Sequence, residues 1–149
     1  MADIAGPANL SVMPRILAVD FGEKRIGLAT SDAEGLLATP RRTILRRGDD
    51  AAAKALLRFC EEEEIEIVVF GIPCFPDGVE SPFAARVRSF ARKFGDKAAL
   101  PVLFHEETLT SVEASRRLPR GAPREEVDRV AAQVLLEDFL EDSRAGGRR

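Results

Sequence analysis

The stretch that decides the fold spans Arg15 to Asp32 and reads RILAVDFGEKRIGLATSD. Its first apolar run ends in a carboxylate, Asp20, and the turn FGEK separates it from a second run, RIGLATS. Short apolar runs of this kind, separated by a polar break, predict two strands at 15–20 and 25–31 that form a hairpin. Aspartate is depleted in strands. Strand propensity therefore does not explain why an acid lies at the end of a buried strand.

Outward from this hairpin, the chain predicts a mixed α/β sheet. Residues 36–45 read as a third strand, and Pro40 confines it to an edge because proline cannot donate to the ladder. Further strands are predicted at 65–73 and 101–105, with helices at 49–63, from Ser81 onward, at 110–118 and at 124–141. Strand–helix–strand connections are right-handed parallel crossovers. We therefore expect a five-stranded sheet, three antiparallel strands followed by parallel ones, with the first strand central and helices on the faces.

Composition predicts one globular domain. The chain has 149 residues, of which 45% are hydrophobic and 32% charged. We expect a disordered leader at 1–14, a domain at 15–141 and a flexible tail at 142–149. No apolar run approaches the roughly 20 residues that span a bilayer, and the start lacks a signal-peptide pattern. These absences favour a cytoplasmic protein with no membrane partner.

Metal-binding cysteines are not a feature of this sequence. Cys60 and Cys74 form no CxxC pair, and the chain has a single histidine, His105. A structural zinc site is therefore not expected. Cys60 lies in an amphipathic helical pattern and is predicted to be core. His105 is interpreted as a packing or hydrogen-bonding residue rather than a general base.

The charge distribution leaves two interpretations open. A net charge of −3 counts mildly against a nucleic-acid binder, because such proteins are often basic. Acids gather in EEEEIE at 61–66, whereas arginines occur in pairs elsewhere, as at Arg41-Arg42 and Arg116-Arg117. The pairs are either phosphate contacts or solvated faces. The sign of the net charge does not decide between them, since local distribution matters more.

Acids fall where a site is expected in such a sheet. Asp20 ends the first strand, Glu106 and Glu107 end the fifth, and Asp128 lies one turn into the last helix, at the border of its apolar stripe. The carboxyl ends of parallel strands meet at one edge. Each pair of carboxylates about 4 Å apart costs about 4 kcal/mol at an effective dielectric constant of about 20. A divalent cation such as Mg²⁺ is the natural compensation, and two such ions hydrolyse phosphodiesters.

Each acid also has a plain structural interpretation. Asp20 could be a turn residue at a strand end, the two glutamates a solvated strand end, and Asp128 an acid favoured by the helix dipole. Only their convergence on one crevice indicates a metal site. Gly22 and Gly27 are predicted to let a phosphate backbone approach closely. Asp32 closes the second, antiparallel strand and is expected at the opposite end of the sheet.

Four blocks in order resemble the YqgF/RuvX family. They are DFGEKRIGLATSD at 20–32, VVFGIPCFPDGVESPFAARVRSFA at 68–91, PVLFHEETLTSVEA at 101–114 and VDRVAAQVLLEDFL at 127–140. The resemblance covers roughly 15–141. It implies a ribonuclease H-like fold and a metal-dependent nuclease, since members are described as Holliday junction resolvases and as nucleases that mature the 5′ end of pre-16S rRNA.

The resemblance also implies the site residues. Asp20, Glu107 and Asp128 fall on the family's acids and would be the catalytic residues and the ligands of Mg²⁺ or Mn²⁺. The chain departs from the family pattern at Thr108, where arginine is usual, at Glu106, where aspartate is usual, and at 75–76, where Phe-Pro replaces an asparagine and a methionine. None of these departures touches the three acids.

The leading hypothesis is a two-metal nuclease that acts on structured RNA or branched DNA. Predicted nucleic-acid contacts are Lys24, Arg25, Phe75, Arg86, Arg88, Arg92 and Arg116. Pre-ribosomal particles are a further expected partner, and the chain is a monomer or a homodimer, the latter required for symmetric junction cleavage. The alternatives are a resolvase, a catalytically inactive binding module, and a sugar-kinase or actin-like ATPase, which needs two such domains.

Overall fold

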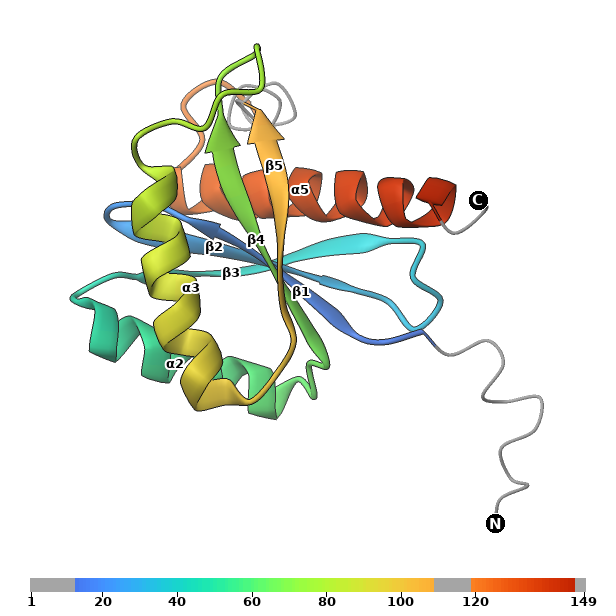
Figure 1. The fold of residues 1–149 in the computed structure, drawn as a ribbon, viewed down its shortest axis with the longest axis horizontal. Coiled ribbons are helices and arrows are strands. Elements are labelled where there is room, and N and C mark those ends of the chain that lie inside the picture. Colours follow the sequence, from blue (N-terminus) through green and yellow to red (C-terminus); the bar gives the residue numbers. More distant parts are fainter. Residues whose placement is uncertain (1–12, 109–118, 147–149) are drawn as a thin grey trace.

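The computed structural model describes residues 13–108 and 119–146 (Figure 1). Its strands are β1 (Ile16–Phe21), β2 (Arg25–Ser31), β3 (Ala38–Leu45), β4 (Ile67–Cys74) and β5 (Val102–Thr108). Its helices are α2 (Asp49–Glu62), α3 (Ala84–Ala98) and α5 (Arg124–Gly146). The helix predicted at 110–118, and with it Arg116, lies outside the described residues.

The sheet has the predicted topology. Its strand order is β3-β2-β1-β4-β5, so β1 is central and β3 is at an edge. β1 pairs antiparallel with β2 and parallel with β4, and β4 pairs parallel with β5. Pro40 is tolerated in β3, opposite Ala29, because the register of this edge strand shifts between Gly27 and Ala29. The predictions of a mixed five-stranded sheet and of a central first strand are confirmed.

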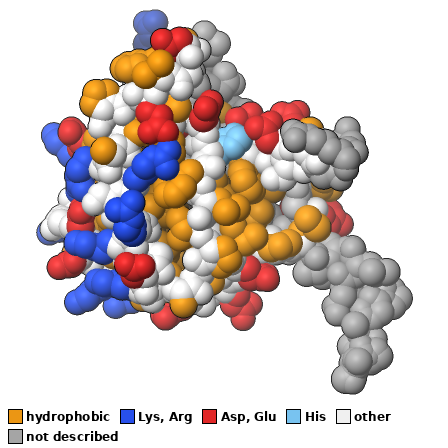
Figure 2. Space-filling view, in the orientation of Figure 1, with side chains coloured by type: hydrophobic (Ala, Val, Ile, Leu, Met, Phe, Trp, Pro, Cys, Tyr) orange, Lys and Arg blue, Asp and Glu red, His pale blue; other side chains and the backbone are white. Residues whose placement is uncertain are grey.

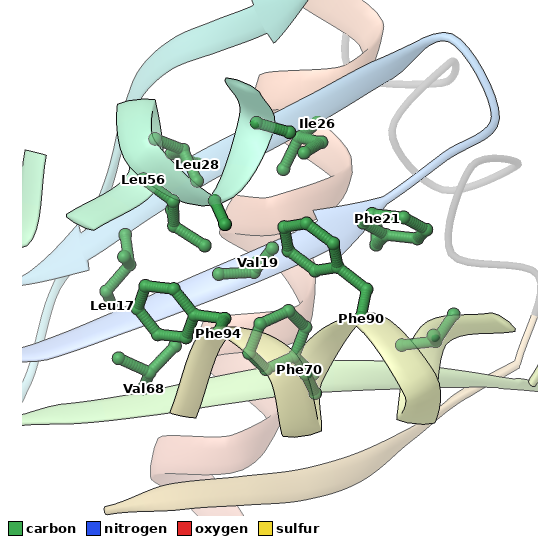
Figure 3. Close-up of a cluster of buried hydrophobic side chains, with 14 of the residues drawn as sticks. Leu17, Val19, Phe21, Ile26, Leu28, Leu56, Val68, Phe70, Phe90 and Phe94 are labelled. Carbon is green, nitrogen blue, oxygen red and sulfur yellow. The ribbon is translucent and has the colours of Figure 1, made fainter. Parts of the chain in front are cut away.

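Helices cover both faces of the sheet, α2 and α3 on one and α5 on the other (Figure 1). The larger core lies under α2 and α3, where Phe70, Phe90 and Phe94 pack against Leu17 and Val19 of β1 (Figure 3). Because side chains alternate along a strand, Ile16 and Ala18 of β1 face α5 instead. β1 is therefore buried on both faces, as its continuous apolar character predicts.

The face under α5 is built from smaller side chains. Ala18 of β1 and Ala29 of β2 pack against Leu135 and Leu136 of α5. Small residues on the strands let the helix lie close to the sheet, which brings residues of its first turns next to the strand ends. No helix in the described part of the chain is both long enough and apolar enough to cross a bilayer.

Several element boundaries differ from the prediction, including those of β3 and β4, which begin at Ala38 and Ile67, two residues after their predicted starts. β5 continues to Thr108, because it follows β4 in register to the end of that strand, opposite Cys74. α3 begins at Ala84 instead of Ser81, since residues 82–83 form a turn. α5 continues to Gly146, five residues past the predicted end, and Arg144 ties this last turn to the Gly35 carbonyl oxygen at 3.2 Å.

Candidate active site

The carboxyl group of Asp20 lies near the end of β1, where Glu107 of β5 and Asp128 of α5 act on it. Protein surrounds it on most sides, and it keeps only partial solvent exposure. Desolvation raises its pKa well above the ordinary value, and the negative charge of Glu107, a hydrogen bond to Glu107 and the charge of Asp128 raise it further. The structure therefore brings the three predicted acids together, although they come from distant parts of the chain.

Glu107 is held inside the fold. It is 7% exposed, and it is the only acidic or basic side chain classed as buried among the described residues. Its carboxylate lies over Gly71 of β4, where any Cβ atom would collide with it. A glycine in the interior of a strand weakens that strand, so it marks a close approach. Gly71 is a site residue that the sequence analysis did not select, although this signal was present.

The neighbouring Glu106 faces the other way. Adjacent residues of a strand point to opposite faces, and Glu106 is exposed, with its charge acting on the thiol of Cys74. The charges that act on the Asp20 carboxyl group are those of Glu107 and Asp128. The geometry thus separates the two glutamates, and the inner position belongs to Glu107. Both lie within β5, which ends at Thr108 and not at residue 105 as predicted.

Asp128 is paired with a cation. The Nε of Arg25 donates a hydrogen bond of 2.8 Å to its Oδ2, and the two side chains are 20% and 25% exposed. Arg25 was predicted to contact the phosphate backbone, and that contact stays a prediction. In the structure Arg25 belongs to the acid cluster, where it orients the Asp128 carboxylate and offsets part of the negative charge.

The two glycines of the opening hairpin have a structural reason. A Cβ atom on Gly27 would collide with the backbone carbonyl oxygen of Asp128, so glycine is what allows α5 to approach β2. A Cβ atom on Gly22 would lie 2.8 Å from the carbonyl oxygen of Arg25, inside the tight β1–β2 turn. We predicted room for a phosphate backbone at both positions, but helix and turn backbone fill that space.

A crevice of about 850 Å³ opens beside Asp128. Its lining includes Phe21, Lys24 and Arg25 from the β1–β2 hairpin, Phe83 from the segment before α3, and Arg124 from the start of α5. Lys24 was among the predicted contacts. Phe83 and Arg124 were not, because nothing local in the sequence distinguishes them from other aromatic and basic residues.

Most of the basic residues predicted on α3 are neutralised by nearby acids. Arg86 pairs with Asp49 at 3.3 Å, and Arg88 pairs with Glu80. Figure 2 shows basic side chains over α3 interspersed with acidic ones. Arg92 is exposed, as is Phe75 in the loop that follows β4. This face is a mixed-charge surface and not a continuous basic track.

His105 joins β5 to α5. Its Nε2 lies 2.7 Å from Asp138 Oδ2 and 3.6 Å from Asp142 Oδ2, and its ring packs edge-on against Phe139. Together with the two aspartates it forms a group whose ligand atoms lie within 4.8 Å of one another. The prediction of a packing and hydrogen-bonding histidine is confirmed.

Comparison with known proteins identifies the family. The profile described as RuvX, Holliday junction resolvase, matches residues 14–142. The chain belongs to the RuvX family. One relative of this RuvX chain, from Koribacter versatilis, is 40% identical over 136 residues, covering 88% of this chain and 89% of the relative. Another, from Streptomyces avermitilis, is 38% identical over 140 residues, covering 90% of each. Both are named "Putative pre-16S rRNA nuclease".

Solved structures share the fold of the RuvX chain. Thermus thermophilus RuvC in complex with a Holliday junction substrate superposes with a TM-score of 0.58 at 12% identity, covering 89% of this chain and 97% of that one. The fowlpox virus resolvase in complex with Holliday junction DNA gives 0.53 at 13% identity, covering 86% and 97%. At these identities the likeness concerns the fold alone. The predicted ribonuclease H-like fold is confirmed.

Proposed function

We propose that this RuvX chain is a metal-dependent nuclease that hydrolyses phosphodiester bonds in structured RNA and matures the 5′ end of pre-16S rRNA. The observation that carries the proposal is the confinement of Asp20 beside Glu107 and Asp128, which raises its pKa. Three carboxylates forced together in this way are a costly arrangement without a cation. The names of the relatives support nuclease activity and the ribosomal substrate.

The donor set fits a hard divalent cation. Asp20, Glu107 and Asp128 offer only carboxylate oxygens, which Mg²⁺ and Mn²⁺ prefer, and Gly71 leaves the space that the Glu107 carboxylate occupies. These three residues would hold the metal. Two bound ions would supply an activated water and stabilise the leaving oxygen of the phosphodiester.

The remaining work of the site is positioning. Burial of Glu107 and the 2.8 Å hydrogen bond from Arg25 to Asp128 hold two of the three acids in place before any substrate binds. Preorganised groups of this kind lower the cost of orienting reactants. Lys24 and Arg124, at the edge of the crevice, attract the phosphate backbone.

Holliday junction cleavage is the second candidate. The description of the family profile favours it. Symmetric cleavage of a four-way junction requires two active sites related by a two-fold axis, so a resolvase would act as a homodimer. A catalytically inactive binding module would give no reason for three acids to converge on one point.

The test compares two substrates and two variants. With Mg²⁺ or Mn²⁺, we expect the parent protein to cleave an RNA that carries the 16S precursor leader, and to cut a four-way DNA junction much more slowly. Asp20→Asn should lose the metal-dependent cleavage. Asp32→Asn, a matched change at the other end of the sheet, should keep it. If the Asp20 variant cuts as fast as its parent, the metal site is misassigned, and preference for the junction would favour the resolvase.

A further inference from the structure

The crevice beside Asp128 extends beyond the three acids. Its lining includes Asp128 but neither Asp20 nor Glu107, so it begins at one side of the proposed metal site and leads away from it. Its volume of about 850 Å³ lies within the range of roughly 300–1,000 Å³ that is common for ligand pockets. Three segments that are distant in sequence form it: the β1–β2 turn, the residue before α3 and the first turns of α5.

Two cations in this crevice are available to an anion. Lys24 and Arg124 are both exposed, and the described residues provide neither of them with a carboxylate partner. The third cation, Arg25, is committed to Asp128. Glu23 also lines the crevice and is exposed. Arg86 of α3, by comparison, is paired with an acid. The crevice is therefore a better site for phosphate than the surface of α3.

One wall of the crevice is aromatic. Phe83 is partly exposed there, and its ring stacks on that of Phe21, with centroids 6.0 Å apart and planes inclined by 21°. Phe21 is itself 4% exposed and stacks on Phe90 at 4.5 Å. The ring of Phe83 is thus held by contact with buried aromatic rings, while it keeps partial solvent exposure in the crevice lining.

We propose that this crevice binds an unpaired nucleotide that flanks the cleaved phosphodiester bond, with its base stacked on Phe83 and its phosphate held by Lys24 and Arg124. The inference rests on the proposed nuclease function and specifies its substrate. Sequence-tolerant binding of single strands combines cations for the backbone with aromatic rings for the bases. A base that is stacked within a helix has no free face for such a ring, so the substrate is single-stranded at the point of cleavage.

The aromatic contact is tested with a matched set of RNA substrates. One leader RNA is single-stranded at the cleavage point, a second lacks the base of the flanking nucleotide, and a third is paired with a complementary strand there. We expect the parent to cleave the first about tenfold faster than the other two, as the loss of one base–aromatic stack predicts. Phe83→Leu should show about the same loss on the first RNA and no further loss on the abasic one, because the two changes remove the same contact.

Controls separate this contact from a structural effect. Phe104→Leu changes a phenylalanine of β5 that is 40% exposed and is not among the residues that line the crevice, and it should leave the cleavage rates unchanged. Thermal melts of both variants check the fold. If Phe83→Leu loses the same factor on the intact and the abasic RNA, the ring has no role in base binding. If paired RNA is cut as fast as unpaired RNA, the substrate class is wrong.

The cations are tested by binding, without catalysis. In the Asp20→Asn background, Lys24→Ala and Arg124→Ala should each weaken binding of the first RNA and reduce the slope of log Kd against log salt by about one. Lys54→Ala, an exposed lysine of α2, should do neither. If the parent cleaves none of the RNAs, yet binding depends on Phe83, Lys24 and Arg124, the crevice stands and the nuclease function fails. If the parent cleaves the RNA but the crevice variants behave like Lys54→Ala, the proposed nucleotide site is wrong and the nuclease function stands.

Discussion

Asp20 and Asp32 close the two runs of one hairpin, but they lie at opposite ends of the sheet. At the Asp20 end, Glu107 and Asp128 add negative charge to a desolvated carboxyl group, and the pKa of Asp20 is raised. Asp32 has the opposite surroundings. Desolvation is the largest single influence and acts to raise the pKa of Asp32, but the hydrogen bonds from backbone N–H groups of the turn after β2 together outweigh it and lower the pKa.

The difference shows what each acid needs. The Oδ1 of Asp32 accepts hydrogen bonds from the backbone N–H groups of Leu36 and Leu37 at 2.8 and 3.1 Å, so its charge is satisfied within the chain. Among the described residues, the charged neighbours that affect the pKa of Asp20 are both acids, Glu107 and Asp128. An acid that stabilises a turn and an acid that binds a ligand are thus distinguished by their surroundings and not by residue type.

Replacing Asp20 should give the largest loss of activity, because Asp20 is the acid assigned to ligand binding. We expect Asp20→Asn to lower kcat/KM by about a thousandfold, or about 4 kcal/mol of transition-state stabilisation, because a metal ligand is lost. Measured in EDTA, the same variant should raise the Tm by roughly 2–4 °C, since removing a crowded charge stabilises the fold. A fall in the Tm together with full activity would contradict the metal-site assignment.

The two adjacent glutamates of β5 provide a second comparison between an acid in the site and an acid outside it. Glu107→Gln should lower kcat/KM by roughly a hundredfold or more, because a buried metal ligand is neutralised. Glu106→Gln changes an exposed side chain on the opposite face and should stay within about twofold, since surface substitutions rarely matter more. Steady-state kinetics with the leader RNA measure both, and equal losses would mean that the face of the strand does not matter.

Gly71 offers a test that leaves every charge in place. In Gly71→Ala, the new methyl group collides with the carboxylate of Glu107, which must shift from its position in the acid cluster. We expect a loss of about 10–100-fold in metal affinity, the range seen when groups that orient ligands are changed. Titration calorimetry with Mn²⁺ measures it directly. Gly146→Ala, where a Cβ atom meets nothing within 4 Å, is the control and should bind like the parent.

Removing the acid at the other end should give the smallest effect. Asp32→Ala loses hydrogen bonds of the turn and should lower the free energy of unfolding by about 1 kcal/mol near pH 7, with cleavage unchanged. Because the folded pKa of Asp32 is lowered, its contribution is complete above the unfolded pKa of about 3.9 and is lost as the pH falls through the folded pKa. Urea unfolding of the parent and of Asp32→Ala should therefore give a smaller difference in the free energy of unfolding at pH 2.5 than at pH 7.

Local patterns were enough to predict the sheet. The apolar runs of β1 and β2, the proline of β3 and the helical periodicity of α2 are local features, and each led to an element that the structure contains. Element ends were less accurate. β5 extends to Thr108 because it pairs with β4, and α5 extends to Gly146 through the contact of Arg144 with Gly35. Both extensions depend on partners outside the segment concerned.

By itself, the sequence determined that an acid stands at the tip of a central strand, and that further acids follow on β5 and α5. These conclusions need only periodicity, strand order and the rule that parallel strands end at one edge. The tertiary structure alone decided that Arg25 and Asp128, 103 residues apart, form an ion pair. It also decided that Gly27 makes room for helix backbone and not for substrate. Such contacts depend on strand register and on how closely α5 crosses the sheet, which no local pattern contains.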